Sequence, residues 1–189
     1  MALSVETYGS EVLRRKSEPI AKPNAELLRF AHDMKATLRE ENGIGLAAPQ
    51  AGRNLRLIIV DTRQDEELPE MMQTEGETFL TPLMPVALIN PVLTPVGTNK
   101  SRFVEGCLSI PGIEGEVVRP VHVTLEANLD DGTPVKLHCG GLLARCLQHE
   151  LDHLDGVLFV DRMNALDRVR IAPQLLNLKS RTKRAAGRV

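Results

Sequence analysis

The sequence lacks two features that would place it at or beyond a membrane. No apolar run approaches the length that crosses a bilayer as a helix. The first residues, MALSVETYGSEVLRRKSEP, lack the apolar segment and the small-residue cleavage site of a secretory signal. We therefore expect a cytoplasmic protein that makes no membrane contact.

Cysteine is scarce and the net charge is small. The chain has three cysteines, an odd number without an export signal, which argues against a disulfide framework and favours free thiols or metal ligands. A net charge of −2 and a pI near 6.2 argue against a protein that binds DNA over its whole surface. With 189 residues, the chain is long enough to bury one core.

The first half of the chain alternates helical and strand patterns. Apolar residues at helical spacing predict an amphipathic helix that begins after Asn24 and ends at Gly43. Apolar runs predict buried strands at 55–61 and 86–93. The acidic segment between them, 62–85, contains three prolines and shows no clean periodicity, so it is predicted to be an exposed loop.

The second half begins with a predicted β-hairpin. Residues alternate in character over 121–139, and the Asp131-Gly132 pair supplies the turn. A helix is then predicted from Leu142 to about Asp155, with Gly156 as its stop. The last segment is helical in pattern but contains Pro173, so it is predicted to fray into a basic tail.

The predicted helix after the hairpin carries the sequence QHELDHLDG (148–156). Helical spacing places Glu150 on the stripe that core residues occupy, with His149 and His153 on the adjacent stripe. A buried carboxylate is costly unless a charge or hydrogen bond meets it. A metal bound by the two histidines would meet it, and Glu150 would then handle the proton of an activated water. The alternative is a chance pattern on an exposed helix.

A catalytic metal site of this type needs a third protein ligand. Cys139 lies in a predicted strand and Cys146 lies one turn before the first histidine, so both fit core packing. Cys107 lies in the irregular stretch EGCLSIPG, where thiols are usually exposed and available for chemistry, and it is the favoured ligand. The other candidates are Asp161 and Asp167.

Two further functions fit the same residues. A metalloprotease of another HExxH family would need a third ligand downstream of His153, and none is well spaced there. A non-catalytic module could use a closed four-ligand zinc site, which would need neither Glu150 nor Gln50. That site would consist of Cys107, Cys139, Cys146 and His149.

Three motifs in this order, GIGLAAPQ (43–50), EGCLSIPG (105–112) and QHELDHLDG, resemble those of the peptide deformylases. The similarity spans Val12 to Arg162, and the helical end resembles the type I, bacterial-like subgroup. The resemblance implies an α+β fold with mixed, largely antiparallel sheets around a central HExxH-bearing helix, followed by a C-terminal helix. It implies a catalytic unit over 1–163, with the C-terminal helix and basic tail over 164–189.

The resemblance also implies an activity and a metal. Such an enzyme removes the formyl group from the N-terminal formylmethionine of newly made polypeptides and releases formate. The matched motifs imply that Cys107, His149 and His153 bind one divalent ion, natively Fe²⁺, with Zn²⁺, Ni²⁺ or Co²⁺ able to occupy the site. They imply that Glu150 shuttles the proton.

The remaining implied roles concern the substrate. Gln50 and the backbone N–H of Leu108 are implied to hold the formyl oxygen, where each preorganised donor is worth on the order of 3 kcal/mol. The backbone of Gly45 is implied to pair with the substrate peptide. The wall of the methionine pocket is assigned to Ile44, Glu105, Cys146 and His149.

Glu105 has a second interpretation, in which it pairs with Arg119 and braces the loop that carries a ligand. The chain end has two interpretations as well. Its cluster of basic residues without acids is either a solvated disordered end or, as the resemblance implies, a contact for ribosomal RNA. These basic residues are Lys179, Arg181, Lys183, Arg184 and Arg188.

Overall fold

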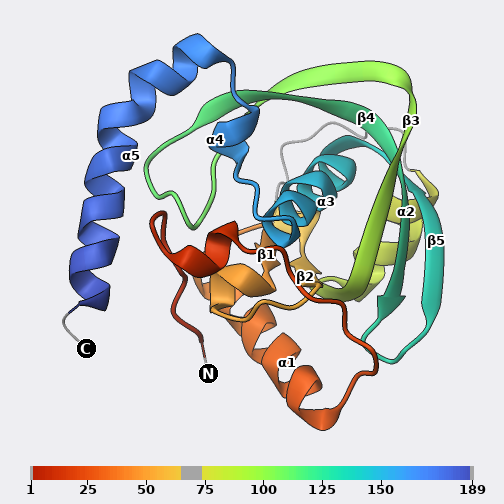
Figure 1. Ribbon diagram of the computed structural model, residues 1–189. Helices are drawn as coiled ribbons and strands as arrows, with labels where there is room; N and C mark the ends of the chain where they lie inside the picture. The colour runs from red at the N-terminus through yellow and green to blue at the C-terminus, as the bar shows by residue number, and fades with distance from the viewer. Residues whose placement is uncertain (1, 65–73, 188–189) are drawn as a thin grey trace.

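We describe a computed structural model that covers residues 2–64 and 74–187. Its strands form a single five-stranded sheet in the order β1-β2-β3-β4-β5, and every neighbouring pair is antiparallel (Figure 1). The expected α+β fold with largely antiparallel strands is confirmed. The strands are β1 (Gly45–Ala47), β2 (Leu57–Val60), β3 (Val86–Glu105), β4 (Gly115–Leu129) and β5 (Pro134–Cys139).

The long strands β3 and β4 form most of the sheet. β3 runs far beyond the predicted 86–93 and pairs with β4 from Leu88 to Glu105, with irregularities in register on the way. The predicted hairpin of β4 and β5 is present, and Gly132 in its turn has a φ of +88°. β3 therefore ends directly at the EGCLSIPG segment, which connects it to β4.

Helices α1 (Ala25–Glu40) and α3 (Gly141–Leu154) pack on opposite faces of the sheet. Alternating side chains of β2 separate the two cores, since successive strand residues point to opposite faces. Leu57 and Ile59 belong to the core under α1, whereas Ile58 and Val60 belong to the core under α3. The sheet thus holds α3 in a fixed position beside β1.

The ends of the two helices follow local chemistry. The Asn24 side chain accepts a hydrogen bond from the Leu27 N–H and caps α1, as the sequence indicates. The prediction of Gly43 as the stop of α1 was wrong, because the helix ends at Glu40 and Asn42, not Gly43, takes the positive φ of +52°. Gly156 has a φ of +73° and ends α3 as expected.

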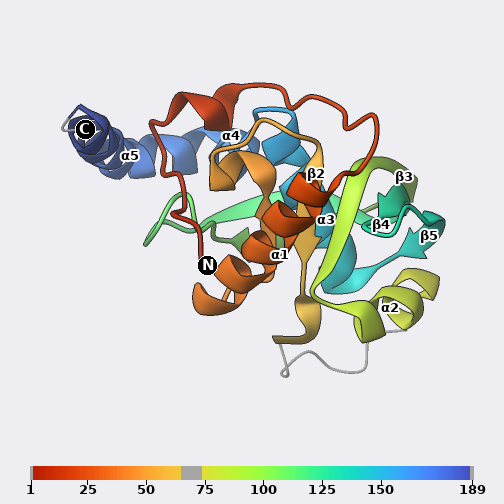
Figure 2. The ribbon, with the colours of Figure 1, turned by 90° about the horizontal axis from the view of Figure 1, so that it is seen from below.

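The segment 62–85 is not an uninterrupted loop. Residues 65–73 lie outside the described part, but Thr62–Gln64 (η3), Glu75–Leu80 (α2) and Thr81–Leu83 (η4) are helical. The Glu77 carboxylate accepts a hydrogen bond from the Thr74 N–H at the start of α2, which favours this short helix. Figure 2 shows α2 beside β5, at one edge of the sheet.

The chain end is helical over nearly its whole length. After α4 (Phe159–Arg162), helix α5 (Ala165–Ala186) continues through Pro173, so the predicted fraying into a tail was wrong up to Ala186. One side of α5 packs against the buried cluster around Phe159, and the hydroxyls of Thr7 and Thr182 lie 2.7 Å apart. α5 therefore lies along the N-terminal segment (Figure 1). None of the helices in the described ranges could span a membrane.

Two further 3-10 segments complete the described elements, and they contact each other. They are η1 (Glu11–Arg14) and η2 (Ala48–Ala51). η2 follows β1 directly and contacts α3, the helix that carries the HExxH sequence. This arrangement brings the end of the first motif to the third motif.

Candidate active site

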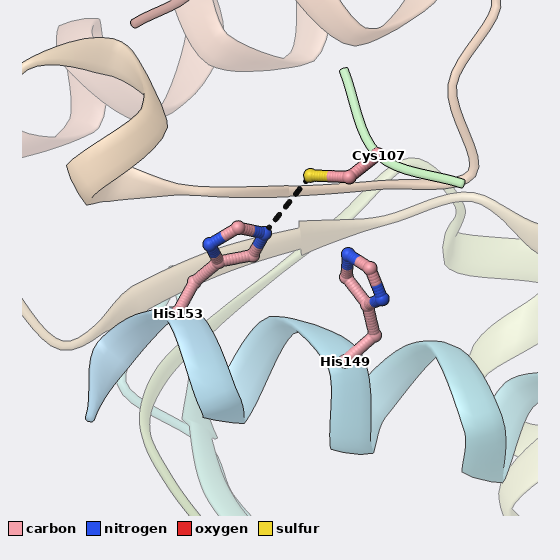
Figure 3. Close-up of side chains that lie close together, drawn as sticks. All are labelled: Cys107, His149 and His153. Atoms are coloured by element: carbon pink, nitrogen blue, oxygen red, sulfur yellow. Dashed lines mark hydrogen bonds between the residues drawn. The ribbon is translucent and has the colours of Figure 1, made fainter. Parts of the chain in front are cut away.

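The three predicted metal ligands converge. Cys107 lies just after β3, and His149 and His153 project from one side of α3 because they are one turn apart (Figure 3). Their ligand atoms all lie within 4.8 Å of one another. The Cys107 sulfur lies 3.3 Å from His153 Nε2. This is the donor set, one thiol and two imidazoles, that suits a transition-metal ion.

Glu105 fixes the orientation of the His149 ring through the nitrogen Nδ1. One carboxylate oxygen lies 3.0 Å from His149 Nδ1, which leaves Nε2 available as a ligand. The same carboxylate accepts two hydrogen bonds from Arg119, at 2.7 and 2.9 Å, and one from Arg145 at 2.7 Å. The pairing of Glu105 with Arg119 that the sequence suggested is thus present.

These charges are buried together. Glu105 is 6% exposed, and Arg119 and Arg145 are buried as well. Burial would raise the pKa of Glu105, but hydrogen bonds from His149 and Arg119 outweigh it and lower that pKa well below its usual range. Arg119 also donates to Asp152 at 2.8 Å, so the network returns to α3. The loop that carries Cys107 is therefore fixed to the helix that carries the histidines.

Glu150 lies beside the ligand set with no partner for one of its oxygens. It is 3% exposed, and its Oε2 has no hydrogen-bond partner within the described part of the chain. Burial raises the pKa of Glu150 to about 7, although His149 and Arg119 act in the opposite direction. A carboxyl group with such a pKa can both hold and release a proton near neutral pH.

Gly45 allows Glu150 to lie this close to the sheet. A Cβ atom at this position would clash with Glu150 Oε1 and would lie 2.8 Å from Cys146 Sγ. Only glycine leaves room for both side chains, so steric contact with α3 explains this residue of the first motif. Cys146 is buried here and lies 3.3 Å from the Ile44 carbonyl oxygen. Burial raises the pKa of Cys146 well above its usual value.

Gln50 approaches Cys107 from the opposite side of the site. Its amide oxygen accepts a hydrogen bond from the Ala47 N–H at 2.7 Å, which fixes the amide orientation. Its Nε2 lies 3.3 Å from Ser109 Oγ and 3.5 Å from Cys107 Sγ. The neighbouring Leu108 N–H has no hydrogen-bond acceptor among residues 2–64 and 74–187. The Gln50 amide therefore lies beside the thiol, and the Leu108 N–H is unpartnered within the described ranges.

A cavity of about 480 Å³ opens onto this set of residues. Its lining includes the four residues assigned from the sequence to the methionine pocket, together with Phe103 and Leu142, so it has both apolar and charged walls. It also reaches Gln50, Glu150 and the ligands on its near side. The four assigned residues are Ile44, Glu105, Cys146 and His149.

The structure does not bring the other candidate ligands to the site. Cys139 lies in β5 against Gly76 of α2, and burial raises its pKa to about 12. Asp161 pairs with Arg14. Asp167 lies in the first turn of α5, where its backbone N–H donates to the side chain of the capping residue Asn164. Within the described ranges, the group of residues that could hold a metal contains neither Cys139 nor Cys146, so the four-ligand zinc site was wrong.

Sequence reasoning missed three residues that shape the site. Arg145 and Asp152 are charged residues on an otherwise apolar helix, one turn before His149 and almost one turn after it, and this spacing was a usable signal. Ser109 is fully buried and contacts Gln50, but a serine in an irregular loop carries no comparable signal.

Comparison with known proteins identifies the family. The sequence model of the polypeptide deformylases matches residues 2–169. A peptide deformylase of Opitutus terrae is 44% identical over 188 residues, which is 98% of this chain and 97% of that protein. Peptide deformylase 2 of Gloeobacter violaceus is 42% identical over 92% of this chain and 84% of its own length.

Solved structures agree with this result. The crystal structure of a peptide deformylase of Arabidopsis thaliana has a TM-score of 0.83 at 31% identity and covers 98% of this chain and 94% of its own. A peptide deformylase from Synechococcus elongatus, solved with actinonin, has a TM-score of 0.74 at 36% identity and covers 96% of this chain and 86% of its own. The chain therefore belongs to the peptide deformylases, the metal-dependent hydrolases that remove the formyl group from the N-terminus of newly made polypeptides.

Proposed function

We propose that Cys107, His149 and His153 hold the divalent metal of this deformylase and that Fe²⁺ is the native ion, with Zn²⁺, Ni²⁺ or Co²⁺ able to replace it. The convergence of the three donors within 4.8 Å, beside the unpartnered Glu150 Oε2, is the observation that carries the proposal. When bound, the ion supplies a Lewis acid that activates water as the nucleophile.

Glu150 holds and moves the proton. Burial raises its pKa to about 7 against the opposing effect of His149, so it accepts a proton from the nucleophile and delivers it to the departing amine nitrogen. Its place on α3, directly after the first histidine, keeps the carboxylate beside the ligand set. The contact with Gly45 limits its side-chain motion because Oε1 lies against the glycine backbone.

Gln50 and Leu108 hold the formyl oxygen as negative charge develops on it. The Gln50 amide nitrogen lies 3.5 Å from the Cys107 sulfur and is already oriented by the hydrogen bond from Ala47, and Leu108 directly follows Cys107 in the chain. Donors fixed before the reaction need no reorganisation, and the loss of one such donor costs roughly 2.7 to 4 kcal/mol in the barrier.

The peptide binds along the free edge of β1. This strand pairs only with β2 within the described sheet, so the Gly45 backbone is placed to add an extended peptide as a further strand. Ile44 and Cys146 then form the apolar wall for the methionine side chain, with Glu105 at its base. The cavity volume of about 480 Å³ suits one such side chain and the adjoining backbone.

The deciding experiment compares wild type with Glu150→Ala after anaerobic purification. Formate release from a formyl-Met peptide and the metal content are measured on the same samples. We expect the variant to keep its metal and to lose activity by at least about 100-fold, since general acid–base catalysis contributes that much. Full activity in the metal-loaded variant would refute the role of Glu150. Inactivation of wild type by air, with restoration by Fe²⁺, supports iron.

We also propose that the basic end of α5 contacts ribosomal RNA in the cytoplasm, where nascent chains emerge. Four basic residues lie in about the last two turns of this helix. Binding of basic residues to RNA releases counterions, so such binding depends on the salt concentration. Deletion of 180–189 and the helix-preserving variant Lys183→Gln/Arg184→Gln should both weaken ribosome binding in a sedimentation assay. Binding unchanged at low salt in both variants would refute the proposal. The four residues are Lys179, Arg181, Lys183 and Arg184.

A further inference from the structure

Two exposed carboxylates border the cavity that contains the active-site residues. Glu41 follows α1, and Glu114 lies in the segment between β3 and β4. They come from the two loops that enclose the cavity, which meet where a Cβ on Gly43 would lie 3.0 Å from the Leu108 side chain. Glu41 and Glu114 form no ion pair with any other residue in 2–64 and 74–187.

No cation at the cavity offsets these two charges. Arg145 is the single lysine or arginine among the described residues that line it. Its guanidinium is engaged by Glu105 at 2.7 Å and by Ser101, with hydrogen bonds to the backbone oxygen at 3.0 Å and to the hydroxyl at 2.9 Å. The free charges at the entrance are therefore negative, and a cavity with charges of one sign attracts ligands of the other.

The free edge of β1 connects the reacting end of the peptide to these carboxylates. If the added peptide runs antiparallel to β1, the residues that follow the methionine continue toward Gly43 and Glu41, which line the same cavity as Ile44. Each extended residue advances by about 3.3 Å. The side chains that follow the methionine thus reach the entrance within a few residues.

We propose that Glu41 and Glu114 make this enzyme favour nascent peptides with basic side chains directly after the formylmethionine, an inference that rests on the proposed function. The two carboxylates act as a specificity-determining pair and do not take part in the reaction. Because both are exposed, their effect is screened by salt. Electrostatic complementarity of this kind changes the choice of partner more than it changes the chemistry.

The test compares three peptide amides of the form formyl-Met-Xaa-Xaa-Ala, in which Xaa is Lys, Gln or Glu. For wild type at low salt, we expect kcat/KM to fall in the order Lys, Gln, Glu, with a ratio of roughly 3 to 10 between the first and the last, as expected for charge interactions near a surface. Inhibition by the unformylated products should follow the same order. Both differences should shrink at about 0.5 M salt.

Variants distinguish the effect of the two entrance carboxylates on peptide preference from the effect of the protein's net charge. The double variant Glu41→Gln/Glu114→Gln should abolish the preference, and Glu114→Lys should reverse it. The control is Glu126→Gln, which removes one negative charge on β4 outside the cavity, where Glu126 pairs with Lys136. It should keep the preference of wild type.

Equal kcat/KM for the three peptides in wild type, or a preference that persists in the double variant, would overturn the inference. These outcomes differ from a failure of the proposed function. If the metal-loaded wild type releases no formate even from the uncharged Gln peptide, the deformylase assignment of the site is refuted instead.

Discussion

Replacement of Glu105 by glutamine should weaken the fold and the metal site together. The carboxylate lies between Arg119, Arg145 and His149, with four contacts between 2.7 and 3.0 Å. Glutamine keeps the shape but removes the charge, so two buried guanidinium groups lose their shared counter-ion. Breaking a buried ion pair on one side costs about 3 to 5 kcal/mol.

That cost can be converted to a melting temperature. For a chain of this size, 1 kcal/mol corresponds to roughly 2 to 4 °C, so Glu105→Gln should lower Tm by about 6 to 20 °C. Loss of the hydrogen bond to His149 Nδ1 should also weaken metal affinity by roughly 10- to 100-fold. Circular dichroism of the metal-free protein measures the first effect, and Zn²⁺ titration against a chelator measures the second.

The control is Asp155→Asn, which breaks the exposed pair of Arg56 and Asp155. Asp155 is 44% exposed, so this surface pair should be worth at most about 1 kcal/mol. A Glu105→Gln variant that melts within about 2 °C of the Asp155→Asn protein and binds Zn²⁺ as wild type does would refute the reasoning. The two variants remove equal charge, so net charge cannot account for a difference between them.

The stability that Glu105 supplies should also depend on pH with a defined sign. The fold lowers the pKa of Glu105, so the unfolded chain, with a value near 4.3, binds this proton more readily. The contribution is complete above about pH 5 and is lost as pH falls below the unfolded value. The Tm difference between wild type and Glu105→Gln should therefore be constant from pH 5 to 8 and narrow in stronger acid.

Two further predictions concern the close packing around α3. Gly45→Ala should lower Tm by roughly 2 to 12 °C, since overpacking typically costs about 1 to 3 kcal/mol, and should reduce formate release because the new Cβ displaces Glu150 or Cys146. Normal activity and Tm would show that the contact relaxes at no cost. Iodoacetamide at pH 8 should label native metal-free protein at Cys107 alone, because burial raises the pKa of Cys139 to about 12 and that of Cys146 well above its usual value. Mass spectrometry checks this, and labelling of Cys139 in the folded protein contradicts it.

The sequence predicted the site better than it predicted the connections between elements. HExxH and its helix were readable because polar residues interrupted an apolar stripe, and Cys107 was readable because it lay in an irregular segment. The length of β3 was not readable, since its outer half is largely exposed and lacks a clean apolar pattern. Helix α2 was missed because it spans only Glu75–Leu80, too short for a helical period to stand out.

The end of the chain shows how tertiary contacts overrule a local signal. Pro173 removes one backbone donor and ends most helices, yet α5 continues to Ala186. Ile171, Leu175 and Leu178 share one face of the helix and pack against the buried cluster that includes Ile110, Ile113 and Phe159. Ile110 and Ile113 are distant from α5 in the sequence, so no inspection of the last residues alone could reveal these contacts.

The charge network explains why this chain can pack three polar side chains on one stripe of α3 against the sheet. Arg145, His149 and Asp152 share one stripe of α3 and meet Glu105 and Arg119 of the sheet, so each charge has its counter-ion before any metal binds. The orientation of His149 is thereby fixed during folding, and metal binding loses less side-chain entropy. The same contacts that stabilise the chain therefore set the geometry of its metal ligands, and selection for one property maintains the other.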